Sequence, residues 1–216
     1  MTLETRNVLI VGGGGHAKVV IEVFRSAGHE PGGILDPHAS EHDVLGVPVL
    51  GGDDRAQQLF KDGYRHAHVA IGENALRQRI GYRLKDMGFG LMNALHPSAV
   101  ISPSAELGAG IAVMANAVIN AKARVSDFVI VNTGAIVEHD CLVGMGTHVA
   151  PRSVMGGNVV LEGGVLFGIG AVARPLSRIG ARAVVGAGSV VIGTISADAI
   201  VAGNPARVLR QTKASN

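Results

Sequence analysis

The second half of this chain repeats with a period of six residues and keeps that register without a slip. Counting by six from Ile101 to Val191, all sixteen residues are apolar. A second column, four residues further along each repeat, holds mostly small residues such as Ala117, Ala123 and Ala135. A strand in a β-sandwich alternates with period two, so a sandwich of short strands explains this pattern less well than a repeat architecture does.

The six-residue period predicts a solenoid. Each repeat is expected to form one short strand and one corner, and three repeats to close a triangular coil, with successive coils about 4.8 Å apart. We expect the large apolar residue to point into the coil and the small one to lie near a corner. Glycine directly follows the apolar residue in six repeats, where we expect it to permit turn dihedrals that a side chain would not. Residues 94–216 are therefore assigned to a β-helix.

Residues 1–93 carry strands that alternate with helices. The apolar run Val8–Val11 predicts a buried strand, residues 17–24 recur at helical spacing, and Ile34-Leu35 predicts a second strand. A third unit follows, with a strand at 67–71, a turn at Gly72 and a helix at 76–87. This alternation predicts a small Rossmann-like domain with a parallel sheet. The predicted domain boundary lies at residues 93–97.

Four consecutive glycines follow the first predicted strand. Gly12, Gly14 and Ala17 satisfy the G-x-G-x-x-G/A spacing, and Asp36 follows about 20 residues later. Such a turn places backbone N–H groups and a helix N-terminus beside a phosphate. The turn could serve NAD, the phosphate of a nucleotide or nucleotide sugar, or only local structure. About 90 residues is only half of a dinucleotide domain, which argues against NAD and favours a nucleotide or nucleotide sugar. His16, at the helix start, is interpreted as a cap or a surface residue more readily than as a catalyst.

The segment 132–141 (NTGAIVEHDC) is the most chemically loaded part of the repeats. If Val137 points inward, His139 falls at a corner, and its neighbours one coil away are the small residues Ala121 and Gly157. A protruding imidazole with small neighbours leaves room for a substrate and could act as a base. A single histidine on a β-surface is also commonly inert, and the residues alone do not decide between the two.

Two carboxylates flank His139. Either Glu138 or Asp140 could hold one ring nitrogen, but Asp140 also stacks above Lys122, which could compete for it as an ion pair. His148 lies half a coil from His139, so the two could meet only across a subunit boundary. A further column of small residues predicts either a groove for a thin ligand or simple corner packing: Asn132, Ala150, Gly168 and Gly186.

Composition excludes several classes of protein. A formal charge of +2 is too small to indicate nucleic-acid binding. The single cysteine, Cys141, allows no intramolecular disulfide and lies in the small inward column, so we expect a core residue and not a nucleophile. The N-terminus has no signal-peptide pattern and no window has 18 consecutive apolar residues, so we expect no membrane span and a cytoplasmic location.

Taken together, these motifs indicate similarity to a known family. The chain resembles the bacterial nucleotide-amino-sugar N-acetyltransferases of the bacillosamine and perosamine type, and the related sialic-acid O-acetyltransferases. The resemblance covers nearly the whole chain and rests on eight segments in order: Val8–Lys18, Ile34–Asp36, Ala70–Arg77, His96–Ser104, Asn132–Cys141, Thr147–Val149, Gly156–Val159 and Ala202–Arg207.

The resemblance implies a left-handed parallel β-helix and a homotrimer with active sites between neighbouring β-helices. It implies acetyl-CoA as co-substrate in the cleft, a nucleotide-linked amino sugar against the N-terminal domain, no metal, and a place in lipopolysaccharide O-antigen biosynthesis. It assigns the catalytic base to His139, with Asp140 and Glu138 as acidic companions, and sugar contact to Asn132. The implied coenzyme A residues are His148, Gly157, Gly168, Ile169 and Gly186. The implied nucleotide-sugar residues are Gly12, Gly14, Gly15, His16, Asp36 and Gly72.

The chain departs from the family pattern at residues 173–178 (ARPLSR). The apolar position holds only Ala173, and Arg174 and Arg178 add charge that could meet the phosphates of coenzyme A. The expected activity is acetylation of the 4-amino group of a nucleotide-linked 4-amino-4,6-dideoxy sugar. The alternatives are a sugar O-acetyltransferase, a zinc enzyme like the γ-carbonic anhydrases with His96 as a further ligand, and a trimeric binding protein without activity.

Overall fold

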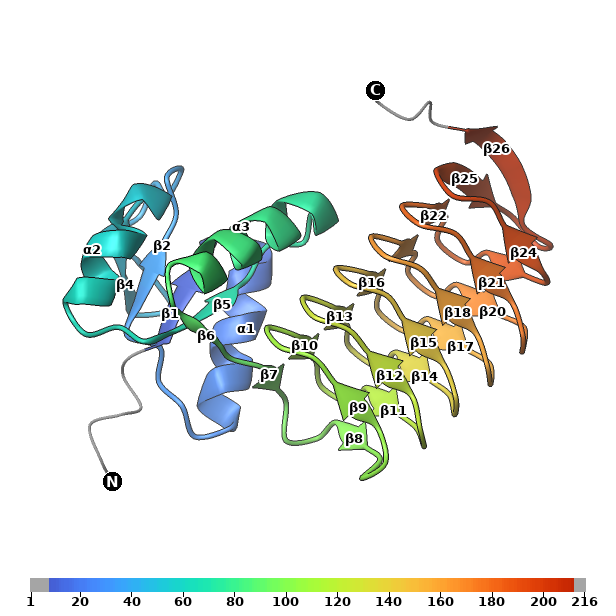
Figure 1. Cartoon of the computed structure of the whole chain (residues 1–216), viewed down its shortest axis with the longest axis horizontal. Helices are drawn as coiled ribbons and strands as arrows, with labels where there is room; N and C mark the ends of the chain where they lie inside the picture. Colours follow the sequence, from blue (N-terminus) through green and yellow to red (C-terminus); the bar gives the residue numbers. More distant parts are fainter. Residues whose placement is uncertain (1–7, 212–216) are drawn as a thin grey trace. The chain divides into compact units, whose positions relative to one another are not determined.

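The computed structural model describes residues 8–211 of the chain. The chain divides into two compact units, Met1–Pro97 and Ser98–Asn216. The first is an α/β unit and the second is a β-helix, as the sequence predicts (Figure 1).

The α/β unit is built on one sheet whose strand order reverses at its first strand. β1 (Val8–Val11) pairs in parallel with β2 (Gly33–Leu35) on one side and with β5 (His66–Val69) on the other. β4 (Val47–Gly51) extends the sheet beyond β2, and β6 (Gly90–Leu91) extends it beyond β5. β3 (Asp43–Val44) is the antiparallel edge strand. In open sheets of this kind ligands bind outside the carboxyl ends of the strands where the order reverses, which here is the turn after β1.

Helices cover both faces of this sheet. α1 (Gly15–Ser26) packs on the face that holds His68, whose ring meets Phe24 edge-on at 5.6 Å. α2 (Ala56–Lys61) and α3 (Asn74–Asp86) pack on the other face through an apolar cluster that includes Leu9, Leu59 and Leu84. The predicted strands and helices are present, but β3, β4, α2 and the short helix η2 (Asp53–Arg55) were not foreseen. β7 (Ala94–Leu95) follows β6.

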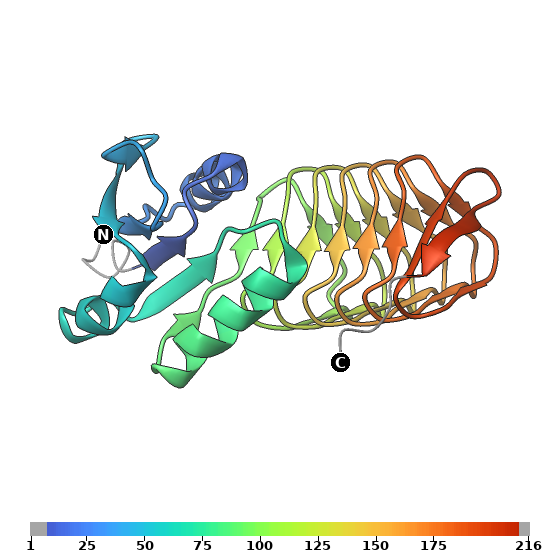
Figure 2. The same cartoon turned by 90° about the horizontal axis from the view of Figure 1, so that it is seen from above.

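The second unit is a parallel β-helix of left-handed type, with 18 residues in each coil except the last, where β21 pairs with β24 and β22 with β25 at a spacing of 16 residues. Figure 2 shows its coils stacked in register. The first sheet contains β8 (Val100–Ile101), β11 (Val118–Ile119), β14 (Ile136–Val137), β17 (Val154–Met155), β20 (Val172–Ala173) and β23 (Val190–Val191). The second contains β9 (Glu106–Leu107), β12 (Arg124–Val125), β15 (Leu142–Val143), β18 (Val160–Leu161), β21 (Arg178–Ile179) and β24 (Thr194–Ile195). The third includes β10 (Ala112–Val113), β13 (Ile130–Val131), β16 (His148–Val149), β19 (Leu166–Phe167), β22 (Val184–Val185), β25 (Ala199–Ala202) and the antiparallel β26 (Arg207–Gln211).

The hexad column fills the coil interior. Its first two members, Ile101 and Leu107, are half-buried, and all the later members are buried. Most corners turn through a residue with positive φ, and most of these residues recur every 18 positions; one such column is Lys122, Asp140, Asn158 and Leu176. The narrow triangular section follows from this combination of two-residue strands and left-handed corner residues.

The expected role of the hexad glycines was wrong. The glycines that directly follow the apolar residue do not have positive φ. A Cβ at Gly144 would lie 2.5 Å from the backbone nitrogen of Gly163, and one at Gly156 would lie 2.7 Å from Cδ of Pro175. These glycines therefore permit close approach of successive coils, whereas the turn dihedrals fall on residues two positions later.

Within residues 8–211, no helix combines the length and apolar character that a bilayer crossing requires.

Candidate active site

His139 and Asp140 form a hydrogen-bonded pair at one corner of the β-helix. β14 ends at Val137, and His139 and Asp140 make the turn that follows, with Asp140 at φ 58°. His139 Nδ1 lies 2.8 Å from Asp140 Oδ2. Because a carboxylate can only accept, Nδ1 donates this bond, and in the neutral ring Nε2 is the acceptor. The histidine side chain is 55% exposed, so this nitrogen is available to a ligand.

The structure distinguishes the two flanking carboxylates. Glu138 Oε2 accepts from the backbone N–H of His139 at 3.3 Å, whereas Asp140 contacts the ring itself. Lys122, one coil below, donates its backbone N–H to Ser104 Oγ at 3.2 Å. Among the described residues it forms no ion pair with Asp140. Asp140 is therefore the residue that orients the imidazole.

Gly157 lies directly above His139. A Cβ at Gly157 would be 2.5 Å from His139 Nε2 and 2.6 Å from Cε1, so the ring occupies the space that any other residue would fill. The coils are joined here by the Asn158 N–H, which donates to the His139 carbonyl oxygen at 3.0 Å. Within the described part of the chain the Gly157 N–H donates no hydrogen bond. A free donor beside a free imidazole nitrogen is an arrangement suited to acyl transfer.

Asn132 and His148 form a second pair. Asn132 Nδ2 lies 3.0 Å from His148 Nε2, and Asn132 Oδ1 accepts from the Thr133 N–H at 2.8 Å. The amide therefore supplies the donor, and His148 Nε2 accepts. His148 projects outward from β16 on a different sheet from β14, so the chain brings Asn132 and His148 together but places His139 elsewhere.

The predicted small-residue column has a packing role of its own. A Cβ at Gly168 would overlap the carbonyl oxygen of Val185, and one at Gly186 would lie 3.0 Å from the Ala202 Cβ. Coil packing alone therefore requires glycine at position 168. Ile169, at the neighbouring corner, is 60% exposed and presents an apolar side chain to solvent.

Cys141 is a core residue. It is fully buried, and its Sγ donates to the Gly156 carbonyl oxygen at 3.1 Å. Burial raises the pKa of the thiol to about 11, so it is protonated at neutral pH. A thiol in that state is a poor nucleophile.

The α/β unit holds a pocket of about 310 Å³ beside the four-glycine turn. It is lined by Gly13, Gly14, Lys18, Asp36, His38, Ala39, Ser40, Glu41 and Val44. α1 begins at this turn with no side-chain cap and no acidic residue in its first turn. A Cβ at Gly14 or Gly15 would meet nothing within 4 Å, so this side of the turn is open. The open N-terminus of a helix favours a bound anion.

Asp36 holds the two loops that border this pocket. Its Oδ2 accepts from the Gly13 N–H at 2.6 Å, and its Oδ1 accepts from the His38 N–H at 2.8 Å. In dinucleotide-binding domains the equivalent acidic residue binds the ribose. Here both carboxylate oxygens already have backbone partners, which weakens the comparison with an NAD site.

His16 is neither a helix cap nor a surface residue, which corrects the interpretation made from sequence. The cap of α1 is Gly14, and His16 Nε2 is buried with no hydrogen-bond partner among the described residues. Burial, together with the charge of Arg77, lowers the pKa of His16 to about 4. The ring is therefore neutral at physiological pH.

Sequence reasoning did not single out two buried ionisable groups in this unit. His68 is 1% exposed, and its Nδ1 lies 2.9 Å from the Met92 carbonyl oxygen; burial lowers its pKa to about 4. Arg77 is also 1% exposed and contacts the turn that contains Gly72. Arg77 belongs to the AIGENALR segment on which the resemblance partly rests, and that was the only signal for it.

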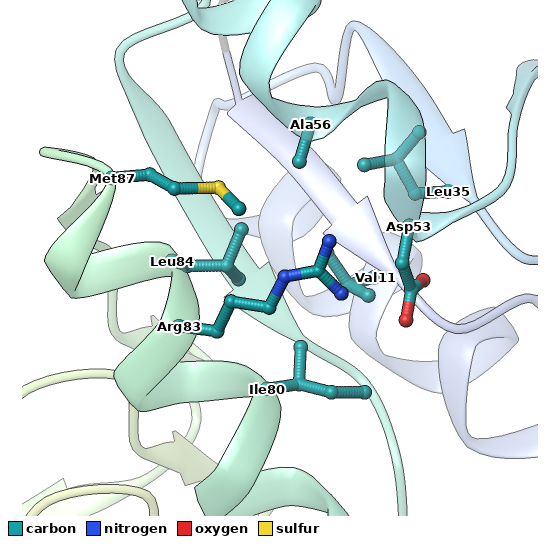
Figure 3. Close-up of a pocket in the computed structure, with 8 residues that line it drawn as sticks. All are labelled: Val11, Leu35, Asp53, Ala56, Ile80, Arg83, Leu84 and Met87. Carbon is teal, nitrogen blue, oxygen red and sulfur yellow. The ribbon is translucent and has the colours of Figure 1, made fainter.

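A second hollow in this unit is too small for a substrate. Figure 3 shows Arg83 reaching from α3 among apolar side chains, with Asp53 on the far side. Its volume is about 10 Å³, which is about the space of one water molecule. Burial raises the pKa of Asp53, and the charge of Arg83 opposes that shift.

Comparison with known proteins identifies acetyltransferases that are similar to this chain over nearly its whole length. The model of the PglD N-terminal domain family matches residues 7–84. PerB from Caulobacter crescentus, solved in complex with CoA and GDP-perosamine, is 46% identical with a TM-score of 0.90, over 93% of this chain and 96% of that chain. Variants of that perosamine N-acetyltransferase in which a histidine is replaced by asparagine or alanine also hold CoA and GDP-perosamine.

Two further relatives agree. The acetyltransferase domain of PglB from Neisseria gonorrhoeae, in complex with acetyl coenzyme A, is 36% identical with a TM-score of 0.90, over 94% of this chain and 98% of that chain. The UDP-N-acetylbacillosamine N-acetyltransferase of Bacillus subtilis is 35% identical over 115 residues, which is 51% of this chain and 52% of that protein. The chain spans between a quarter and about half of the length of the curated relatives it matches. Because the identity to PerB extends over nearly the full length of both chains, this chain belongs to the family of bacterial nucleotide-amino-sugar N-acetyltransferases of the perosamine and bacillosamine type.

Proposed function

We propose that this protein transfers the acetyl group of acetyl-CoA to the 4-amino group of a nucleotide-linked 4-amino-4,6-dideoxy sugar. The observation that carries the proposal is the His139 ring, held by Asp140 with its free Nε2 next to Gly157. GDP-perosamine is the first substrate to test, because the Caulobacter relative that binds it is 46% identical. A UDP-linked 4-amino sugar is the second, by similarity to the Bacillus enzyme.

The geometry supports direct transfer without an acyl-enzyme. The neutral sugar amine attacks the thioester carbonyl, and His139 Nε2 takes the proton that the amine loses. The Gly157 N–H stabilises the negative charge that develops on the carbonyl oxygen. Attack forms the C–N bond and a tetrahedral oxyanion; collapse of this intermediate breaks the C–S bond, and the proton held by His139 passes to the departing thiolate. General-base help is worth roughly 10²–10⁴-fold and one oxyanion donor roughly 10²–10³-fold.

Each unit offers groups that suit one of the two substrates. The pocket beside the four-glycine turn offers backbone N–H groups, Lys18 and His38 to a nucleoside diphosphate. Acetyl-CoA would be held along the β-helix, where Gly157 receives the thioester oxygen and Ile169 offers an apolar contact. Arg174 is exposed at the corner stacked above Gly157, and Arg178 is exposed on β21, which follows that corner; both could meet the phosphates of coenzyme A.

A homotrimer would complete the site. The outward residues of the first sheet of the β-helix are all aliphatic: Val100, Val118, Ile136, Val154, Val172 and Val190. The corresponding positions of the second sheet include Glu106, Arg124 and Arg178, so the apolar column is specific to one face. A continuous aliphatic column on a surface is typical of a subunit interface. Across such an interface His148 and Asn132 of one subunit would approach His139 of the next.

Acetyl-CoA and nucleotide sugars are metabolites of the cytoplasm, so we infer a cytoplasmic enzyme that supplies acetylated sugars for O-antigen synthesis. No metal is assigned a role in this mechanism. Within residues 8–211 no three histidine, cysteine or carboxylate side chains are grouped so as to hold a metal ion.

The proposal is tested with a panel of nucleotide-linked sugars. The purified protein is mixed with acetyl-CoA and GDP- or UDP-linked 4-amino sugars, and thiol release and the product mass are followed. We expect acetylation of an amine acceptor and none of the matched sugar that carries a hydroxyl at C4. Acetylation of the hydroxyl sugar in preference to the amine would replace the proposal with an O-acetyltransferase. Binding of both substrates without thiol release would leave a binding protein.

A further inference from the structure

Arg77 is the largest fully buried side chain among residues 8–211. It lies near the start of α3, and its Nη1 donates to the carbonyl oxygens of Ile71 at 2.9 Å and Gly72 at 3.0 Å. Its Nη2 donates to Asn74 Oδ1 at 2.8 Å. These three acceptors are neutral. The guanidinium thus holds the backbone of residues 70–73, which we call the β5–α3 turn.

The β5–α3 turn packs against the four-glycine turn. The Ala70 N–H donates to the Val11 carbonyl oxygen at 2.8 Å, so the two turns leave adjacent, paired strands. Gly12 has φ +103°, and a Cβ there would lie 2.8 Å from Ile71 Cγ1 and 3.0 Å from the Ala70 carbonyl oxygen. With so little space between them, a movement of the β5–α3 turn would displace the glycine turn.

Arg77 is not needed to start the helix. Glu73 is the N-cap of α3, and its side chain accepts from the N–H groups of Ala75 at 2.8 Å and Leu76 at 2.7 Å. Arg77 instead donates to the carbonyl oxygens of Ile71 and Gly72, which precede that cap in the part of the turn that contacts Gly12. Helix capping therefore does not explain why a long cationic side chain is placed here.

The charge of Arg77 also reaches the start of α1. Burial lowers the pKa of Arg77 to about 10, so the guanidinium remains protonated at neutral pH, and Glu73 favours that state. The same charge contributes, after burial, to the low pKa of His16 in the first turn of α1. Burying a cation is costly, and an apolar residue of similar volume often serves packing as well. The position therefore combines a fixed turn with positive charge that acts on the first turn of α1.

We propose that Arg77 is a positioning residue for the diphosphate of the nucleotide sugar. It fixes the β5–α3 turn against the four-glycine turn and adds buried positive charge near the first turn of α1. The residue acts through the glycine turn and makes no contact with the reacting atoms. This inference rests on the proposed function only in the identity of the ligand.

The test compares two variants. Arg77→Gln removes the charge and the planar guanidinium group. Arg77→Lys keeps the charge, but its single ammonium nitrogen cannot reach all three acceptors at once. GDP and UDP binding are measured by calorimetry, and KM is measured separately for the sugar nucleotide and for acetyl-CoA. We expect Arg77→Gln to weaken nucleotide binding and raise the sugar-nucleotide KM by roughly 10–100-fold, with Arg77→Lys intermediate. The acetyl-CoA KM and kcat should stay within about twofold of wild type. The matched control is Arg79→Gln, an exposed arginine on the same helix, which should behave as wild type.

A loss of folding alone would not give this split between the two substrates. His16 provides a second readout, because its pKa measured by NMR should rise in Arg77→Gln and stay low in Arg77→Lys. Unchanged nucleotide affinity in a folded Arg77→Gln protein would overturn the inference. So would an equal effect on both KM values and on kcat. If the wild type binds GDP or UDP and Arg77→Gln does not, the inference stands even where no acetyl transfer is found.

Discussion

The two units of this molecule differ in where their histidine and arginine side chains lie. The α/β unit buries His68 and Arg77 completely, whereas the buried polar residues of the described β-helix are the neutral Thr147, Ser153, Ser177 and Ser189. A sheet covered by helices on both faces is thick enough to supply a buried group with backbone partners. The interior of a triangular coil supplies small neutral side chains such as Thr147 and Ser153 with backbone carbonyl partners, but it is too narrow for a long charged side chain. The chemistry of the β-helix therefore belongs at its corners, where His139 lies, while the α/β unit can act through charge held within it.

The strongest test of this contrast is removal of the corner imidazole. We expect His139→Ala to lower kcat by roughly 10²–10⁴-fold, the usual range for a general base. The side chain is 55% exposed, so the fold should not change. Steady-state kinetics measures the loss of kcat, and circular dichroism checks that the fold is unchanged. The control is Cys141→Ser, which keeps a donor for Gly156 and should remain active; a folded but inactive Cys141→Ser protein would point to a thiol mechanism.

Gly157 tests whether the ring position matters as well as its presence. A methyl group at position 157 would lie 2.5 Å from His139 Nε2, so Gly157→Ala should push the imidazole aside. We expect kcat to fall on the order of 10²-fold, as when an oxyanion donor is lost. Gly163 occupies the equivalent position of the next corner, and a Cβ there would lie 3.4 Å from the Met145 carbonyl oxygen. Gly163→Ala should therefore leave activity near wild type, and an equal loss in both variants would indicate general damage to the β-helix.

The sequence predicts the β-helix better than the α/β unit, for a physical reason. A coil repeats one interaction many times, so sixteen apolar positions in register identify the interior and place His139 at a corner. The same pattern misassigned the hexad glycines, because positive φ and close approach both favour glycine and only coordinates separate them. In the α/β unit the elements between Asp43 and Lys61 are short and carry no strong periodicity, and they were missed.

Individual contacts at the sites could be predicted only in part. The choice of Asp140 over Glu138 depends on the positive φ of Asp140, which the sequence left open. The pairing of Asn132 with His148 joins residues 16 positions apart, which an 18-residue repeat does not suggest. Arg77 was quoted within a motif, but an arginine in a helical segment is normally interpreted as exposed.

Acidification should destabilise the α/β unit more than the β-helix. His68 has a pKa lowered from 6.5 to about 4, so the folded state binds fewer protons than the unfolded state. Its contribution to stability is present in full above pH 6.5 and is lost as the pH falls toward 4, with a magnitude of ~3 kcal/mol. His16 changes in the same direction. Amide hydrogen exchange at pH 7 and pH 5, corrected for intrinsic rates, should show β1 and β5 losing protection before β14 and β17.

The variant His68→Asn tests whether His68 causes this pH dependence. His68→Asn keeps a donor for the Met92 carbonyl oxygen but cannot titrate, so it should reduce the pH dependence of β1 and β5. Equal loss of protection in both units, or the same pH dependence in His68→Asn as in wild type, would contradict the account of the buried histidine.

The smallest expected effect concerns the free-energy cost of burying a neutral polar group in the β-helix interior. Ser177 Oγ is buried and has no hydrogen-bond partner among the described residues, whereas Ser153 Oγ donates to the Ala150 carbonyl oxygen at 2.7 Å. Both side chains point into the coil, so the two sites differ mainly in that bond. Ser177→Ala should raise the free energy of unfolding by ~1 kcal/mol, and Ser153→Ala should lower it by ~1 kcal/mol. Chemical denaturation followed by hydrogen exchange at β17 and β21 measures both; changes of the same sign would show that coil packing, and not the missing partner, determines the cost of a serine inside the coil.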